Sequence, residues 1–564
     1  MAAILFSLSG FGVAFDSAYT VQDDARQHVF WLQWLNDPNL FDNDLIADYF
    51  SSVAPAGYKF LYWLANLCGL KPFLFNKILP LLLGVGTSIY IFLVTLEIFP
   101  VPFAGFLASL LLNQNLWLLN DLVSGTPRAF FYVLFLGFIY YLLRRQLLLY
   151  LLFIVLQGLF YPQVVLISAA ILIIKAIPKG TLNKGLSRMY SLRIARSVIA
   201  HKQHKYFYLL GLITAFFTLA VYKLKAGEFT EVITLETALQ LPEFYSGGRS
   251  AFFSHNPWHF WLFAERSGFF PFEWQYSALC SFGLFLPIIS KFPHHFPLIR
   301  QLKDSAVIIW QMLLASLGLF FLSHLMLFRL HLPSRYSQHT WRIAIALTAG
   351  ITLAILLHRL VDKIARSSPK IQLGIVAIAI IVLLFPTYAV QFYPSRLGYV
   401  TGQAPQLYQF LQQQPKDVVI ATLSSEADFI PSLAQRRVLV AGEYSIPYHW
   451  DYYQQIRQRT KALIQAQYSF DPLDLTQFIR KYQVDLWLLD SEAFTVEYLN
   501  SNPWLKQFQP ETQNAIASLQ QARQPVIISQ IDRCSMFQTT KFNLLDTKCL
   551  LDEGTWENIN PCQI

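Results

Sequence analysis

The sequence predicts a polytopic α-helical membrane protein, with about 11 transmembrane helices and a soluble α/β domain at the C-terminal end. The 564 residues are 54% hydrophobic and 14% charged, whereas soluble proteins usually carry about 25% charged residues. Long apolar stretches occupy most of residues 1–390, as repeated membrane spans require. Residues 391–564 are richer in Gln, Asp, Lys and Arg and contain no spanning run. We therefore place the boundary between a transmembrane domain, 1–390, and a soluble domain, 391–564.

Eleven apolar segments are candidate spans. They are roughly 1–15, 77–98, 100–118, 127–143, 147–160, 163–177, 206–222, 277–290, 305–328, 341–358 and 370–390. The short pair 147–160 and 163–177 turns at Tyr161-Pro162. One broken or re-entrant element is the alternative for that pair.

The basic loops predict the orientation in the membrane. Residues 178–205 hold seven Lys and Arg and no acid, and the loops 291–303 and 358–370 are also basic. Cytoplasmic loops carry such an excess, so these three face the cytoplasm. The loops 16–76 and 223–276 and the soluble domain then share the outer face. The net charge of +9 is explained by these topology signals, and we expect no nucleic acid partner.

Two adjacent acids, Asp23 and Asp24, follow the first apolar segment. They begin a predicted helix over about 24–35, whose apolar side (Phe30, Trp31, Trp34 and Leu35) suits the membrane interface. Capping of that helix by Asp24, with Gln27 three residues on, is the plain alternative. One acid is enough for capping, and an adjacent pair in an apolar setting is expected to have a raised pKa. The pair is therefore a candidate catalytic site.

Four further acids lie in the same loop: Asp37, Asp42, Asp44 and Asp48. A divalent cation prefers such oxygen ligands, and it stays open as a cofactor. The spacing matches no calcium loop, and turn formation by Asp and Asn explains the acids better. We predict no metal site.

The two later external loops supply polar candidates. Loop 223–276 contains Glu243, a Gly-Gly-Arg run ending at Arg249, and His255. The short loop 329–340 contains Arg335 and Tyr336. An Arg fork fits phosphate oxygens, so Arg335 beside Tyr336 is a candidate for holding a phosphorylated lipid. Contact with ordinary lipid phosphates or with an acidic residue is the equal alternative.

The soluble domain has an α/β pattern. Runs at 417–422, 437–441, 485–490 and 525–529 are predicted strands, and helices are expected around 472–482 and 510–523. No glycine-rich dinucleotide fingerprint is present. Cys534, Cys549 and Cys562 allow three pairings in an oxidising compartment, and we slightly prefer Cys534–Cys549.

Together these features resemble the GT-C superfamily of integral membrane glycosyltransferases. The residues that carry the resemblance are the acidic run from Asp23 to His28, the aromatic stretch after it, the later Pro-Ser-Arg-Tyr turn, and the soluble domain on the same face. The likeness is greatest to uncharacterised bacterial members. The Trp-Trp-Asp motif of oligosaccharyltransferases is absent, which argues against N-glycosylation of proteins.

The resemblance implies a reaction and roles for residues. A polyprenyl-phosphate-linked sugar would be the donor, and a glycan, lipid or protein would be the acceptor at the outer face of a bacterial inner membrane. Asp24 or Asp23 would act as general base in an inverting displacement. Arg335, Tyr336 and Arg249 would bind the donor phosphate, and the substrate-binding candidates are Arg26, His28, Glu243 and His255.

Two other classes stay open. A transporter or flippase of lipid-linked glycans would need charged residues along a central path, and few lie within the predicted spans. A non-catalytic scaffold that binds lipid is the second. The sequence does not identify the sugar or the acceptor.

Overall fold

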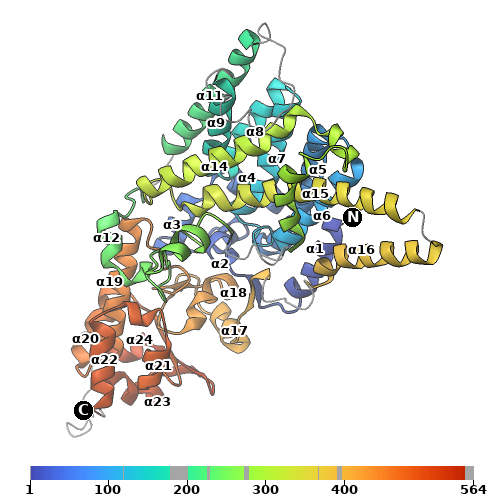
Figure 1. Cartoon of the computed structure of the whole chain (residues 1–564). Coiled ribbons are helices and arrows are strands. Elements are labelled where there is room, and N and C mark those ends of the chain that lie inside the picture. Colours follow the sequence, from blue (N-terminus) through green and yellow to red (C-terminus); the bar gives the residue numbers. More distant parts are fainter. Residues whose placement is uncertain are drawn as a thin grey trace.

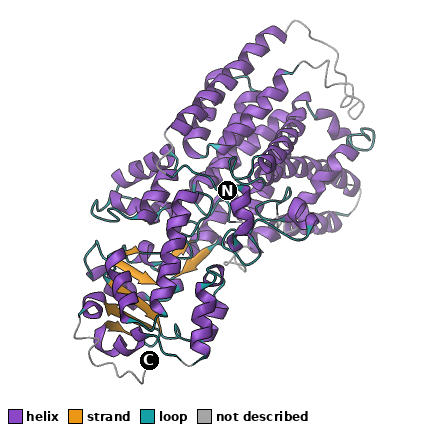
Figure 2. Cartoon of the chain, turned by 90° about the vertical axis from the view of Figure 1, so that its left-hand side faces the viewer, coloured by secondary structure: helices purple, strands orange, loops and turns teal. Residues whose placement is uncertain are grey.

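The computed structural model describes residues 2–117, 120–177, 201–224, 229–271, 278–365, 368–389, 397–521 and 523–552. Most of these residues are helical, and the strands gather at the C-terminal end of the molecule (Figure 2). The predicted domain boundary at 390/391 and the basic stretch 178–200 lie outside the described residues. The boundary stays a prediction.

The apolar segments form helices, as the sequence predicts. They are α1 (Ala2–Ala14), α5 (Pro72–Ile98), α6 (Pro102–Trp117), α7 (Phe130–Leu143), α8 (Leu147–Phe160), α9 (Gln163–Ala176), α11 (His201–Leu224), α14 (Val307–Leu325), α15 (Ser334–Ile364) and α16 (Pro369–Ala389). Segment 277–290 differs, because it folds as the 3-10 helix η6 (Ala278–Phe285) followed by the short helix α13 (Leu286–Ile289).

Four of the described helices are long and apolar enough to cross a membrane: Pro72–Ile98, Tyr206–Leu224, Asp304–Leu325 and Ser334–Ile364. The chain is a membrane protein, and the count of about 11 spans stays a prediction. The apolar window of α15 is 67% buried, whereas that of α11 is 11% buried. Helix α15 is therefore the central helix of the bundle, and α11 lies at its outside (Figure 1).

The connections between these helices hold shorter elements. They are α2 (Ala25–His28), η1 (Phe30–Leu35), α3 (Leu45–Val53), α4 (Ala56–Leu67), η2 (Pro127–Ala129), α12 (Leu235–Gln240), η3 (Pro242–Phe244), the π-helical turn η4 (His259–Phe263), η7 (Pro297–Gln301) and η8 (Asp304–Ala306).

A five-stranded mixed sheet forms the centre of the C-terminal region, in the order β4-β3-β5-β7-β6. Its strands are β3 (Val419–Thr422), β4 (Arg437–Val438), β5 (Leu486–Asp490), β6 (Ser535–Gln538) and β7 (Phe542–Asp546). Strand β3 is parallel to β4 and β5, and β7 is antiparallel to β5 and β6. The helices around it are α17 (Pro405–Gln413), η11 (Ser425–Asp428), α18 (Ile430–Leu433), α19 (Trp450–Gln467), α20 (Pro472–Tyr482), α21 (Val496–Ser501), η12 (Leu505–Gln507), α22 (Glu511–Gln520), η13 (Val526–Gln530), α23 (Ile531–Cys534) and α24 (Thr547–Leu551).

One predicted strand of this region is wrong. Residues 525–529 fall in the 3-10 helix η13, and Val526 and Ile527 are buried there. A short apolar run cannot be told from a buried helical segment by its pattern alone. The hairpin of β6 and β7 supplies the remaining strands.

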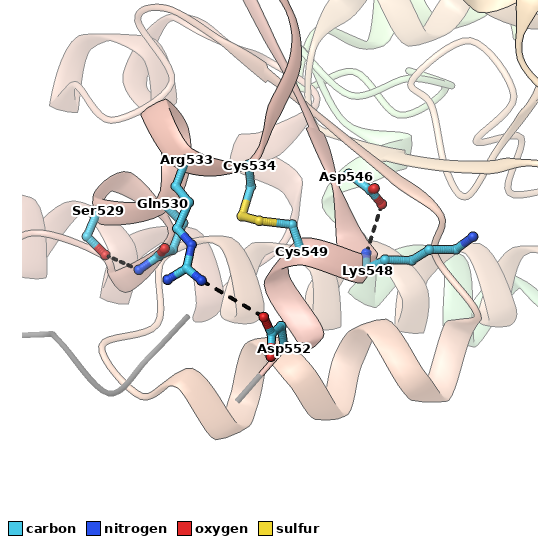
Figure 3. The surroundings of a disulfide bond; sticks show 8 residues. All are labelled: Ser529, Gln530, Arg533, Cys534, Asp546, Lys548, Cys549 and Asp552. Atoms are coloured by element: carbon cyan, nitrogen blue, oxygen red, sulfur yellow. Dashed lines mark hydrogen bonds and ion pairs between the residues drawn. A yellow bond between two sulfur atoms is a disulfide. The ribbon is translucent and has the colours of Figure 1, made fainter. Parts of the chain in front are cut away.

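A disulfide joins Cys534, at the end of α23, to Cys549 in α24 (Figure 3). This is the preferred one of the three pairings. Cys562 lies outside the described residues.

A second, two-stranded sheet connects the two parts of the chain. Strand β1 (Thr20–Gln22) pairs antiparallel with β2 (Tyr399–Thr401). Directly after β1, the Asp23 N–H donates to the Gly398 carbonyl at 2.7 Å. Gly398 has φ +67°, and a Cβ there would lie 2.9 Å from Gln22 Nε2, so a residue with a side chain would be strained at this position. The acidic pair is thereby held against the C-terminal region.

Candidate functional site

The segment after the acidic pair is not the single helix that the sequence predicts. It forms one turn of α-helix, α2, followed by the 3-10 helix η1. Phe30 and Trp31 are buried, and the Phe30 ring lies 5.2 Å from the Tyr444 ring of the soluble domain. Of the four residues predicted for this side, only Trp34 is exposed, at 46%, and the interfacial position stays a prediction.

Asp24 is the N-cap residue of α2, but its side chain makes no capping hydrogen bond. Its Oδ2 instead accepts from Nη2 of Arg128 at 2.6 Å. Arg128 lies in η2, before α7. The capping alternative therefore does not account for Asp24, whose carboxylate faces a cation from another helix.

Positive charge surrounds the Asp24 carboxylate. Burial by itself raises its pKa, but Arg128, Arg335 and Arg249 outweigh burial and hold the pKa below its usual value. This corrects the expectation of a raised pKa, which considered burial and the neighbouring acid but not these arginines. Asp24 is accordingly ionised at neutral pH.

His28, one helical turn after Asp24, is neutral at pH 7. Burial lowers its pKa to about 4, against the opposing charge of Asp24. A neutral imidazole can both accept and donate a hydrogen bond. His28 thus offers polar contact beside Asp24 without adding charge.

Arg335 lies within electrostatic range of Asp24. Within the described part of the chain, its guanidinium makes no ion pair with a carboxylate, although Glu265 lies within electrostatic range. Arg128, Arg266 and Tyr161 are its other charged or titratable neighbours. The sequence allows an ion pair between Arg335 and an acidic residue as an alternative to phosphate binding. No such ion pair is present among the described residues.

A buried polar network holds the Arg128 side chain in position. Asp121 lies 3.8 Å from Arg128 Nε, pairs with Arg342, and accepts from the Tyr132 hydroxyl at 2.7 Å. His339 Nδ1 is 2.8 Å from the same hydroxyl. Because the Asp121 side chain is only 6% exposed, these partners are needed to satisfy its charge. The network fixes the cation that faces Asp24.

Asp23 and Arg26 belong to a second cluster, on the other side of α2. Arg26 pairs with Asp23 and, at 2.9 Å, with Glu443 of the soluble domain. Arg249 reaches the same glutamate at 2.9 Å and donates to the carbonyls of Gly442 and Glu443. The guanidinium groups of Arg26 and Arg249 are thus occupied by protein groups.

The structure separates the remaining candidates from Asp24. Tyr336 is buried, and its hydroxyl donates to the Leu330 carbonyl. Glu243 is fully buried and bonds Tyr453 and Arg457. His255 is exposed, and no hydrogen bond, ion pair or ring contact joins it to other candidates among the described residues. We do not carry these three into the proposed site.

The acids downstream of the pair have structural partners. Asp44 accepts from the Ile46 N–H and caps α3, and Asp37 pairs with Lys416. The search of the described residues finds no group of three or more His, Cys, Asp or Glu placed to hold a metal ion.

Two residues of this site were missed by sequence reasoning. Arg128 lies at the start of the predicted span 127–143, and Asp121 is an acid in the short loop 119–126. Both are single residues, and only the fold shows that Arg128 pairs with Asp24 and that Asp121 lies beside Arg128.

Solved structures of similar fold exist. The archaeal oligosaccharyltransferase AglB from Archaeoglobus fulgidus, in complex with an inhibitory peptide and a dolichol-phosphate, matches with TM-score 0.52 and 13% identity over 91% of this chain and 71% of that chain. The apo form of the Archaeoglobus fulgidus oligosaccharyltransferase matches with TM-score 0.50 and 13% identity, over 90% and 72%. This chain has the GT-C fold.

ArnT from Cupriavidus metallidurans, in the apo state, is also similar, with TM-score 0.44 and 12% identity over 96% of this chain and 97% of that chain. No family model and no curated protein matches the sequence.

Proposed function

We propose that this GT-C chain is a membrane glycosyltransferase that moves a sugar from a polyprenyl-phosphate donor to an acceptor hydroxyl. The proposal rests on a negative and a positive group that lie near each other. An ionised Asp24 is within electrostatic range of Arg335, which makes no ion pair with an acid among the described residues. A base and an anion site side by side are what displacement of a lipid phosphate requires.

The reaction proceeds as an inverting displacement. The acceptor oxygen attacks the anomeric carbon while Asp24 takes the proton from that oxygen. The bond from the anomeric carbon to the phosphate oxygen breaks, and the lipid phosphate leaves with the electron pair. A phosphate leaves without needing a second acid, so one carboxylate is sufficient, unlike hydrolysis of an ordinary glycoside.

We select the phosphate ligands by asking which arginines make no hydrogen bonds or ion pairs that occupy their guanidinium groups. Arg335 is the principal ligand, because a guanidinium fork matches phosphate oxygens. Arg128 and Arg266 lie within electrostatic range of it and add positive charge. Arg249 contributes through its charge at a distance, since its donors are bound to Gly442 and Glu443. Asp23 orients Arg26 and is not the base.

The protein of known structure supplies one further support. The Archaeoglobus fulgidus enzyme was solved with a dolichol-phosphate, which is a polyprenol-type lipid phosphate. We extend that class of lipid to the donor of this chain. Its acceptor is a glycan, lipid or protein, and the transferred group is a hexosyl or pentosyl unit.

The direct test is donor turnover by the full chain in lipid nanodiscs. Synthetic short-chain polyprenyl-phosphate sugars are incubated with an envelope extract as acceptor source, and released polyprenyl phosphate is measured by mass spectrometry. Release by the wild type but not by Asp24→Asn supports the transferase. Binding of the intact donor without release, in wild type and variant alike, overturns it in favour of a flippase or scaffold.

The proposed site faces outward from the inner membrane of a bacterium. In a Cys68→Ser, Cys562→Ser background, Asn39→Cys is expected to react with a membrane-impermeant maleimide in intact cells. Gln146→Cys, exposed between α7 and α8, should react only after permeabilisation. The reverse pattern would put Asp24 on the cytoplasmic face and contradict the topology.

A further inference from the structure

A single glutamate of the soluble domain joins three segments that are distant in the sequence. Glu443 is 7% exposed and lies between β4 and α19. Its Oε2 accepts from Arg26 Nη2 at 2.9 Å, and its Oε1 accepts from Arg249 Nη2 at 2.9 Å and from Gln27 Nε2. Both carboxylate oxygens are therefore used by residues from outside the soluble domain.

The main chain at Glu443 is fixed as well. Its N–H donates to Asp428 Oδ1 at 2.8 Å, and its carbonyl accepts from Gln27 Nε2 and Arg249 Nη2, both at 3.1 Å. The Arg26 guanidinium is further packed over the Phe429 ring, at 4.6 Å. The position of Glu443 relative to Arg26 and Gln27 is thus determined from both its side chain and its backbone.

Arg26 and Gln27 lie in α2, the single helical turn that begins after Asp24. A turn of four residues has few hydrogen bonds of its own and depends on tertiary contacts. A shift of α2 would therefore move the Asp24 carboxylate relative to Arg128 and Arg335.

We propose that Glu443 is a positioning residue for the transfer reaction, through which the soluble domain holds α2 and Arg249 in the geometry that the Asp24 base requires. The proposal rests on the proposed function. Glu443 touches neither donor nor acceptor, and acts through Arg26, Gln27 and Arg249. The soluble domain thereby contributes to catalysis by positioning residues of the membrane part.

Glu443→Gln keeps the shape of the side chain but replaces one of its two acceptor oxygens with an amide donor, so Arg26 and Arg249 can no longer both pair with it. We expect kcat to fall about 10- to 100-fold, because a displacement of about 1 Å can cost about 100-fold. KM for the donor should change less than threefold, since the phosphate ligands are elsewhere. Glu443→Asp keeps the charge and is expected to recover part of the lost kcat.

The matched control is Glu426→Gln. Glu426 is another 7% exposed glutamate of the soluble domain, and it bonds Tyr408 rather than the α2 segment. Both Gln variants are expected to destabilise the domain, but only Glu443→Gln should lower kcat per folded molecule. Equal kcat in the two variants, or no rescue by Glu443→Asp, would overturn the positioning role.

A second measurement separates this proposal from the proposed function. Hydrogen exchange of the full chain is followed at the amides of residues 25–29, with no substrate present. Faster exchange in Glu443→Gln but not in Glu426→Gln supports the positioning role even if no donor is turned over. Unchanged exchange overturns it, whereas failure of every donor with the wild type overturns the transferase proposal alone.

Discussion

Asp24→Asn is expected to lower kcat for sugar transfer by about 10³-fold, which is within the range for loss of a general base. Asn has nearly the same shape as Asp but cannot accept the proton of the attacking hydroxyl. The loss should appear in kcat, measured as initial release of lipid phosphate at saturating donor. Because Arg128 also loses its ion pair, the yield of folded protein is measured alongside.

Asp23→Asn is the control, since it changes the same chemical group one residue away. The Asp23 side chain is 44% exposed and pairs with Arg26, which keeps Glu443 as its second partner, so a loss of less than about 10-fold is expected, as for an exposed ion pair. The lowered pKa of Asp24 also predicts a pH profile. Because this pKa lies below the usual value of about 4, the midpoint of the loss of activity on acidification is expected below that pH. Similar losses in the two variants would contradict the assignment of the base to Asp24.

Arg335→Met should reduce kcat about 10²- to 10³-fold, the usual effect of removing one stabilising group from a developing anion. The leaving phosphate gains negative charge as its bond to the sugar breaks, and Arg335 makes no ion pair with a carboxylate among the described residues, although Glu265 lies within electrostatic range. Arg335→Lys keeps the charge but not the two-pronged geometry. We expect it to recover only part of the activity.

Arg329→Met provides the matched control, from the connection between α14 and α15 that directly precedes Arg335. Arg329 is exposed, and its replacement should leave kcat within about twofold, as for surface substitutions away from a site. If Arg335→Met raised KM but kept kcat, Arg335 would bind donor and transition state equally. If it changed neither, the phosphate site would lie elsewhere.

The sequence was sufficient for the helices of the membrane part, because an apolar run of span length has few ways to satisfy its backbone other than a helix. It also selected Asp24 as a candidate, since a charge beside a membrane span is costly unless it is used, and that role stays a prediction. The disulfide between Cys534 and Cys549 was one of three possible pairings, and only the structure decided among them.

The partners of the candidate residues could not be predicted. Arg249 was interpreted as a phosphate ligand because an arginine in an external loop has that chemistry. The acid that binds Arg249 is Glu443, which is 194 residues away in the sequence. No local sequence pattern predicts such a contact. Glu243 is similar, because its burial against Arg457 and Tyr453 depends on the docking of the loop onto α19.

The pairing of β1 with β2 has a consequence for biogenesis. The acids near the start of the chain leave the ribosome early, but the strand that fixes them is made almost four hundred residues later. Until then Asp23 and Asp24 lack the pairing that holds them against the C-terminal region. If Asp24 is the base as proposed, we expect a product truncated before residue 399 to transfer no sugar.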